Sequence, residues 1–546
     1  MLNINYCRIF LIFFSIVCIS CGNSENTNQG TDSAVEDTGE VPGGWLIYHI
    51  LSEPATLNPI IASDAVESKI NGNNIYESLA KRDYETLEII PQIAESWVIS
   101  DDKLKYKFKL REDVKWHDGM PFTSADVVFS YNTIMDPKVD APHLRSYYQE
   151  ILSVNAIGDY EVEFTYARPY FLALEFCSGM PIVPKHLFDE GDFNKNPYGR
   201  KPIGTGPYKF VKWTTGREIV IKKNEDYWGK KPDLERIVFK IINDPTVAFQ
   251  VLKRGDLDLS GLTPIQWDRQ SNTKVFKDSF NKHKYFRPNY SFIGWNQKKP
   301  YFSDKRVRTA LTHLLNRELI LNKILLDLGV IVTNPFYINS PEYDKSIKPY
   351  NYDPETAKDL LKEAGWIDHN NDGIRDKDGV KFEFELLLPS GSDTSEKIAT
   401  ILKEELDNQG IIMNIRKTEW AVFTTRLNER KFDAVTLGWS MGVESDPYQI
   451  WSSTQMVTGH NFVGFDNKKA EKLITKARKE FNRKDRIKYY QEFANIVHEE
   501  QPYTFLFCRM STVAVSNRFM DVVVYPLGLN PLEWYVPESY QKYGLN

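Results

Sequence analysis

The sequence has only one hydrophobic run that approaches the length needed to span a membrane. It extends from Ile9 to Ile19, and these eleven residues fall short of the roughly 20 that a spanning helix requires. We therefore expect a soluble globular protein rather than an integral membrane protein. The run follows Arg8, as the apolar part of a signal peptide follows its positive charge.

Cysteine is also scarce. The chain has 5 cysteines, and only Cys177 and Cys508 lie beyond residue 21. Two cysteines this far apart in sequence do not form a disulfide framework, although a single disulfide bond and two buried free thiols both fit the sequence.

Positive charge is not in excess. The 68 Lys and Arg residues face 74 Asp and Glu, which gives a net charge of −6. Such a protein offers phosphates no general attraction, so we expect no nucleic-acid partner. Aromatic residues, by contrast, make up 13% of the chain, including 29 Tyr and 12 Trp. Because large aromatic side chains stack on ligands, this content favours a recognition surface.

The N-terminus predicts the compartment. The tripeptide Ser-Cys-Gly centred on Cys21 resembles a bacterial lipobox, although Cys18 stands where Leu is usual. This pattern predicts a signal peptide over residues 1–20, lipidation of Cys21 and a polar, flexible tether over residues 21–44. Cleavage near Ala34, or a short anchor, is the alternative. We expect a lipid-anchored protein of the cell envelope, on the periplasmic or extracellular face of a membrane.

Capping residues and glycines delimit several helices. They predict helices that begin at Thr123, Asp244 and Asp353 and end before Pro137, Gly255 and Gly365, respectively. Residues 381–438 alternate as strand 382–388, helix 394–408, strand 411–417, helix 421–429 and strand 432–438. This alternation indicates an α/β layer, whereas residues 87–118 and 150–166 are rich in strand signals. The predicted fold class is α/β, mixed with α+β in the N-terminal half.

Six ordered sequence blocks resemble the family 5 solute-binding proteins, the extracytoplasmic receptors of ABC peptide importers. The blocks are 94–129 (AESW to PFTSADVVF), 202–210 (PIGTGPYKF), 224–229 (NEDYWG), 305–317 (KRVRTAL to NR), 364–366 (AGW) and 432–447 (FDA to DP). Together they span most of residues 45–540, and six blocks in order are far more specific than any single one. His117, inside the first block, we interpret as a structural residue.

The resemblance implies a two-lobed flytrap fold with an additional domain in the N-terminal half. It assigns residues 45–75, 196–285 and 511–546 to a central lobe, residues 76–195 to the additional domain and residues 286–510 to a C-terminal α/β lobe. It further implies a monomer with no cofactor and no catalytic residue. Its partners would be a peptide ligand and the permease and ATPase subunits of an ABC importer. Oligosaccharides and nickel complexes are alternative cargoes in the same family.

The resemblance also indicates the residues of the binding cleft. Oligopeptide receptors of this type have two cleft tryptophans nineteen residues apart, and Trp420 and Trp439 keep that spacing, although both could instead be core residues. The full candidate set is Asp64, Ala65, Trp420, Trp439, Ser440, Gly442, Glu444, Asp446 and Asn461.

The sequence departs from the family pattern at the ends of the ligand. In peptide receptors of this family, an Asp three residues after the second Trp commonly binds the ammonium group of the peptide. Gly442 stands at that position here, so Glu444 or Asp446 is our candidate for this role. Two arginines that fix short peptides are replaced by Leu427 and Thr436. We therefore expect a peptide longer than two residues.

Two further motifs carry competing hypotheses. The pentapeptide around Ser440 fits G-x-S-x-G, the nucleophile motif of α/β-hydrolases, so a secreted serine hydrolase is the alternative function. The oxygen-bearing residues Asp368, Asn370, Asp372 and Asp376 have calcium-loop spacing. The bidentate Glu of such loops is missing, which favours an Asx-rich turn over a Ca²⁺ site.

Overall fold

Three sheets of four or more strands organise the described part of the chain. The structure is a computed structural model that describes residues 44–62, 64–457 and 459–542. The predicted signal peptide, Cys21 and nearly all of the predicted tether lie outside these residues. No helix in the described ranges combines the length and apolar character needed to cross a membrane.

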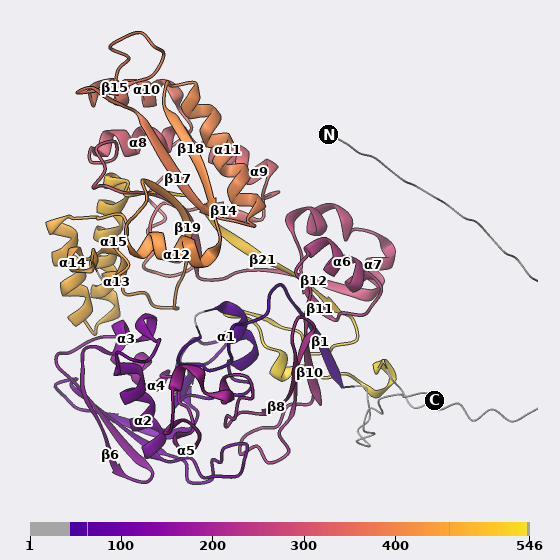
Figure 1. Cartoon of the computed structure of the whole chain (residues 1–546). Coiled ribbons are helices and arrows are strands. Elements are labelled where there is room, and N and C mark those ends of the chain that lie inside the picture. Colours follow the sequence, from indigo (N-terminus) through magenta and orange to yellow (C-terminus); the bar gives the residue numbers. More distant parts are fainter. Residues whose placement is uncertain (1–43, 63, 458, 543–546) are drawn as a thin grey trace, which may run out of the picture. The chain divides into compact units, whose positions relative to one another are not determined.

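The eight-stranded sheet has the order β12-β21-β11-β1-β10-β9-β8, with β14 paired to β21. Its strands are β1 (Trp45–Ile50), β8 (Tyr208–Thr214), β9 (Glu218–Lys223), β10 (Arg236–Ile241), β11 (Leu259–Gly261), β12 (Phe280–Phe286), β14 (Gly329–Ile331) and β21 (Phe507–Ser516). Helices α6 (Pro245–Lys253) and α7 (Lys274–Ser279) lie near β11 and β12 (Figure 1). The sheet is thus assembled from segments far apart in sequence.

The four-stranded sheet is antiparallel throughout, with the order β4-β5-β7-β6. Its strands are β4 (Ala94–Ile99), β5 (Lys105–Leu110), β6 (Ile151–Gly158) and β7 (Glu161–Tyr166), and the helices of this region are α2 (Ser124–Met135), α3 (Pro142–Tyr148), α4 (Ala173–Ser178) and α5 (Lys185–Phe188). Helix α2 has the predicted capping box, in which Thr123 and Asp126 exchange hydrogen bonds, and it ends before Pro137. The strand-rich N-terminal half is therefore confirmed.

The five-stranded sheet has the order β18-β17-β19-β13-β20. Its strands are β13 (Asn289–Trp295), β17 (Glu383–Pro389), β18 (Ile412–Thr418), β19 (Ala434–Ser440) and β20 (Tyr503–Phe505). Strands β17, β18 and β19 are parallel and alternate with α11 (Asp393–Asp407) and α12 (Trp420–Asn428), which confirms the predicted α/β layer. The carboxyl ends of these three strands consequently lie at one edge of the sheet.

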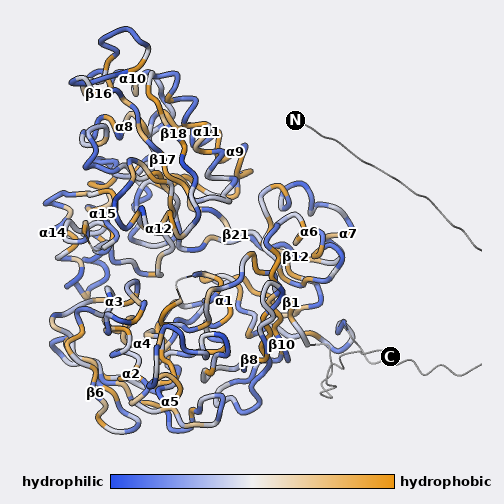
Figure 2. The backbone as a smooth tube through the Cα atoms, viewed as in Figure 1, coloured by the Kyte–Doolittle hydropathy of each residue, from blue (hydrophilic) through white to orange (hydrophobic). Residues whose placement is uncertain are grey.

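The remaining α-helices and the short hairpins lie outside these three sheets. They are α1 (Ala65–Asn71), α8 (Lys305–His313), α9 (Arg317–Lys323), α10 (Pro354–Glu363), α13 (Tyr448–Trp451), α14 (Lys468–Lys479) and α15 (Arg483–Glu500), with hairpins β2 (Ala80–Arg82)–β3 (Ile89–Pro91), β15 (Asp376–Lys377)–β16 (Val380–Lys381) and β22 (Val524–Tyr525)–β23 (Gly528–Leu529). Helices α6 and α10 begin after Asp244 and Asp353, as predicted. In Figure 2, hydrophobic residues follow the central strands, such as β17.

Two of the passages of the chain between the eight-stranded and five-stranded sheets are short. Arg287 and Pro288 join β12 to β13, and Leu506 joins β20 to β21. The passages are hydrogen bonded to neighbouring strands, because the Leu506 amide donates to Ser291 (2.9 Å) and the Met441 amide donates to Pro288 (2.9 Å). These hydrogen bonds hold the end of β19 beside the segment that leaves β12, the first strand in the order of the eight-stranded sheet.

Two residues of the sequence blocks, His117 and Gly204, make close contacts with distant segments of the chain. His117 accepts a hydrogen bond from the Gly204 amide (3.2 Å), and its other ring nitrogen lies 2.9 Å from the Gly206 carbonyl. Burial lowers the pKa of His117 to about 4, so the ring is neutral. A Cβ on Gly204 would stand 1.8 Å from the Ile75 carbonyl oxygen, which explains the need for glycine there. The structural interpretation of His117 is confirmed.

Candidate binding cleft

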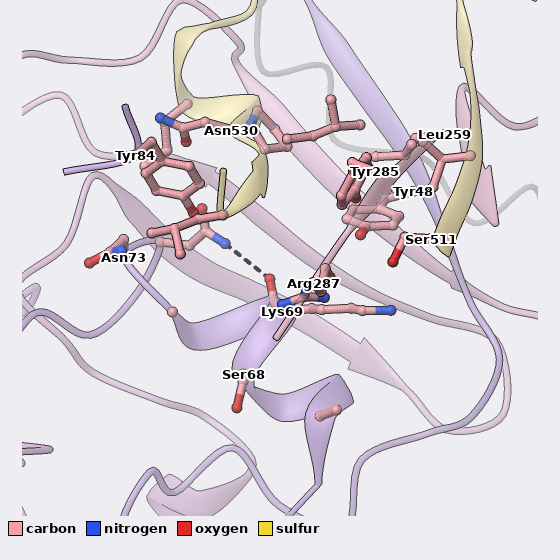
Figure 3. A pocket seen from close by; sticks show the side chains of 18 of the residues that line it. Tyr48, Ser68, Lys69, Asn73, Tyr84, Leu259, Tyr285, Arg287, Ser511 and Asn530 are labelled. Atoms are coloured by element: carbon pink, nitrogen blue, oxygen red, sulfur yellow. Dashed lines mark hydrogen bonds between the residues drawn. The ribbon is translucent and has the colours of Figure 1, made fainter. Parts of the chain in front are cut away.

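A cavity of about 510 Å³ lies where the eight-stranded sheet meets the end of β19; we call it cavity A. Residues of α1 and eight strands line it, together with Arg287 and neighbouring segments; the strands are β1, β10, β11, β12, β13, β19, β21 and β23. Its polar and aromatic lining includes Tyr48, Lys69, Tyr84, Tyr285, Arg287 and Ser440. Figure 3 shows Lys69 and Arg287 close together, with Tyr48 and Tyr285 beside them.

A second cavity, of about 250 Å³, lies at the carboxyl edge of the five-stranded sheet; we call it cavity B. Its lining includes the ends of β17 and β19, the first turns of α11 and α12, and Arg509 of β21. Helices that begin directly after parallel strands leave a crevice at this edge, which is where α/β sheets bind ligands.

Strand geometry places the two cavities in succession. Along β19, Gly438 lines cavity B and Ser440 lines cavity A; along β21, Arg509 lines cavity B and Ser511 lines cavity A. The partner strand β13 repeats the pattern, because Gly438 pairs with Ser291 and Ser440 pairs with Asn289. Residues two apart on a strand share a face, so both cavities open on the same faces of these three strands. We name this pair of cavities the cleft.

The two predicted cleft tryptophans occupy different places. Trp420 begins α12, is 59% exposed, stacks on Phe423 and lines cavity B. Trp439 points to the opposite face of β19, where its ring stacks on Phe462 and its Nε1 donates a hydrogen bond to Tyr503 (3.5 Å). The side chain of Trp439 thus packs among aromatic residues, while Trp420 presents its ring to the cleft.

Glu444 and Asp446 are engaged in ion pairs. The Asp446 carboxylate accepts hydrogen bonds from Arg478 (2.8 Å) and the Tyr170 hydroxyl (3.0 Å), and its side chain is 8% exposed. Burial raises the pKa of Asp446, and the Arg478 charge is the largest opposing influence. Glu444 is paired in the same way with Arg486 (2.9 Å). A ligand ammonium would have to compete with these arginines, so the assignment of either carboxylate to this role stays a prediction.

The other predicted site residues have mixed surroundings. Ala65 and Ser440 line cavity A, and Asp64 caps helix α1 by accepting from the Val66 and Glu67 amides. Asn461 is buried and donates to the Ser452 carbonyl (3.0 Å) and the Phe465 carbonyl (2.8 Å). Gly442 lies in the exposed bend after β19. The structure therefore brings Ala65, Trp420 and Ser440 to the cleft and uses Asp64 and Asn461 in local hydrogen bonds.

The two competing motifs have structural explanations. The nucleophile motif of α/β-hydrolases needs a helix directly after its Ser, but the next helix after Ser440 begins at Tyr448. In the calcium-like loop, Asp368 accepts from the Gly373 amide (2.9 Å), Asp372 pairs with Lys381 and Asp376 pairs with His369. No three His, Cys, Asp or Glu side chains among the described residues are grouped to hold a metal ion. The side-chain carboxylates of residues 368–376 thus make the contacts of an Asx-rich turn.

Comparison with known proteins gives the family. The model of "Bacterial extracellular solute-binding proteins, family 5 Middle" matches residues 88–461. The chain is 34% identical to the oligopeptide-binding protein AppA of Bacillus subtilis over 94% of this chain and 95% of AppA. The chain belongs to family 5 of the bacterial extracellular solute-binding proteins. The predicted mixed α/β fold class and the family resemblance are thereby confirmed.

Members of this family that resemble the chain bind different solutes. The structure of B. subtilis AppA in complex with a nonapeptide has a TM-score of 0.82 and 32% identity to this chain. The match covers 91% of this chain and 100% of the AppA chain in that structure. NikZ of Campylobacter jejuni in complex with Ni(L-His) has a TM-score of 0.78 and 28% identity, with coverage of 91% and 100%. Heme-binding protein A of Haemophilus influenzae is 26% identical over 94% of this chain and 96% of that protein. These relatives are solute-binding proteins rather than enzymes.

Sequence reasoning missed the charged and aromatic lining of the cleft. Lys69, Arg287 and Arg509 stand on a short helix, a passage between sheets and a connecting strand, and none belongs to a sequence block. The sequence offered one signal: Lys69 follows Ala65 by four residues, so the two side chains lie on the same face of α1. That these three residues line successive cavities depends on the tertiary arrangement of the sheets.

Proposed function

We propose that this protein captures oligopeptides in the cleft and delivers them to an ABC permease and its ATPase. The observation that carries this proposal is the succession of two cavities along β13, β19 and β21. A cavity of about 510 Å³ followed by one of about 250 Å³ suits an extended ligand of several residues better than a single ion. The similarity to AppA over nearly the full length supports the same cargo class.

Binding would proceed by domain closure without bond chemistry. A peptide in cavity A would touch Ser440 of the five-stranded sheet, Tyr48 of the eight-stranded sheet and Lys69 of α1. It would therefore favour the arrangement in which both sheets approach it. The passages at Arg287–Pro288 and Leu506 are the natural hinge, because few residues there connect the sheets. We assign residues 45–75, 196–285 and 511–546 to the central lobe, 76–195 to the additional domain and 286–510 to the C-terminal lobe.

The proposed anchoring uses the N-terminal residues. Acylation of Cys21 and the polar stretch up to residue 44 would tether a monomeric receptor to the outer face of a membrane, within reach of its permease. Metabolic labelling with a fatty-acid analogue tests this step. The full chain should be labelled and its Cys21→Ser variant should not; labelling of neither protein would contradict the anchor.

Calorimetric titration with defined ligands tests the cargo. Purified protein from residue 22 onward should bind peptides of more than two residues and show no heat with dipeptides. The Trp420→Ala variant should weaken peptide binding, and Trp366→Phe, at a buried site outside the cleft, serves as the matched control. Binding of oligosaccharides or nickel complexes, with no binding of peptides, would refute the peptide assignment while leaving the family unaffected.

A further inference from the structure

Three cations face the cleft without an acidic partner. Lys69 and Arg287 line cavity A, and Arg509 lines cavity B. Among the described residues that line either cavity there is no Asp or Glu. Within the described ranges, moreover, none of the three side chains makes an ion pair.

The surroundings of these cations favour a role in binding a negatively charged ligand over a structural role. Burial lowers the pKa of Lys69, and the neighbouring Arg287 charge lowers it further, so the two like charges are held together at a cost. Burial also lowers the pKa of Arg509. Other cations that are withdrawn from water have partners: Arg478 has carboxylates, and the buried Arg317 donates to the Phe505 carbonyl (2.8 Å). Negative charge delivered by the ligand would remove this repulsion.

We propose that the cleft selects acidic peptides, whose carboxylates pair with Lys69, Arg287 and Arg509. This inference rests on the proposed function and specifies its substrate class. A single C-terminal carboxylate cannot serve three cations spread over two successive cavities, so side-chain carboxylates of Asp or Glu are required. Tyr48, Tyr84 and Tyr285 add hydroxyl donors and aromatic faces to cavity A, and these suit the backbone and apolar parts of the same peptide.

A competition experiment tests the preference. The protein is mixed with an equimolar pool of nonapeptides. Each Glu-containing peptide in the pool has a Gln-containing partner of the same length. Mass spectrometry then measures which peptides are bound. Because charge-assisted hydrogen bonds are stronger than neutral ones, the acidic member should be enriched about ten- to hundredfold. A second pool with amidated C-termini should retain the enrichment, since the terminal carboxylate is then absent.

Variants separate this inference from the proposed function. Lys69→Met combined with Arg287→Met should abolish most of the preference while retaining the Gln peptides. The control Arg217→Met combined with Lys358→Met removes the same charge from exposed positions outside both cavities and should retain the preference. Equal binding of Glu and Gln peptides by the wild-type protein, or enrichment lost on amidation, would overturn the inference but not peptide binding. Failure to bind any peptide would overturn both.

Discussion

Replacing Arg478 with Met should destabilise the protein strongly, because this residue joins two regions through buried charge. Its guanidinium lies 2.9 Å from Glu150 of the region with the four-stranded sheet and 2.8 Å from Asp446. The side chains of Glu150 and Asp446 are only 9% and 8% exposed. Without Arg478, both carboxylates lose a buried partner, although Arg168 still contacts Glu150.

The expected magnitude follows from the loss of one partner of a buried pair, which costs about 3–5 kcal/mol. An unfolding entropy of about 2.1 cal/mol/K per residue, over about 500 residues, gives roughly 1 kcal/mol per degree. We therefore expect Tm to fall by about 3–5 °C in calorimetry at pH 7. Arg416→Met is the control: its pair with Glu385 is half-exposed, so the cost should stay below about 1 kcal/mol.

The loss should depend on pH. Burial raises the pKa of Asp446 above its unfolded value even with Arg478 present, and removal of Arg478 raises it further. The folded variant then binds a proton more readily than the unfolded chain, so its relative stability increases as the pH falls through the folded pKa. The difference in Tm between wild type and variant should accordingly shrink between pH 7 and pH 5. An unchanged Tm at pH 7, or a gap that widens on acidification, would refute the reasoning.

Three further predictions follow from single sites. Gly204→Ala should lower Tm by several degrees or prevent folding, because its Cβ would stand 1.8 Å from the Ile75 carbonyl oxygen; an unchanged melting curve would show that this approach is absent. Trp420→Ala should weaken peptide binding about two- to tenfold by calorimetry while changing the free energy of unfolding by less than about 1 kcal/mol, because the side chain is 59% exposed. Cys177 and Cys508 are free and buried, and burial raises the pKa of Cys508 to about 11. The native protein from residue 22 should therefore resist a thiol reagent, and the same reagent should modify both residues after denaturation.

Local signals in the sequence predicted the elements well. The caps at Thr123, Asp244 and Asp353 start the helices where expected, because capping is decided by neighbouring residues. The alternation over residues 381–438 likewise fixed the parallel part of the five-stranded sheet. These features depend on short stretches of chain, which a single sequence contains in full.

The cleft was predictable only in part, because its lining depends on contacts between distant segments. The spacing of two tryptophans pointed to Trp420, which lines cavity B. Strand alternation turns Trp439 to the other face of β19, where its ring stacks on Phe462. Two carboxylates close in sequence to Trp439 were natural candidates for an ammonium, yet Arg478 and Arg486 reach them from two later helices. Sequence proximity gave no sign of these partners.

Native mass spectrometry of the protein from residue 22, purified from its own host without refolding, tests the central claim most directly. The account predicts a set of adducts whose masses correspond to peptides of more than two residues, rich in Asp and Glu, which dissociate together as the collision energy is raised. Adducts with the masses of sugars, haem or nickel chelates, in place of peptides, would contradict the claim that this family 5 receptor carries oligopeptides.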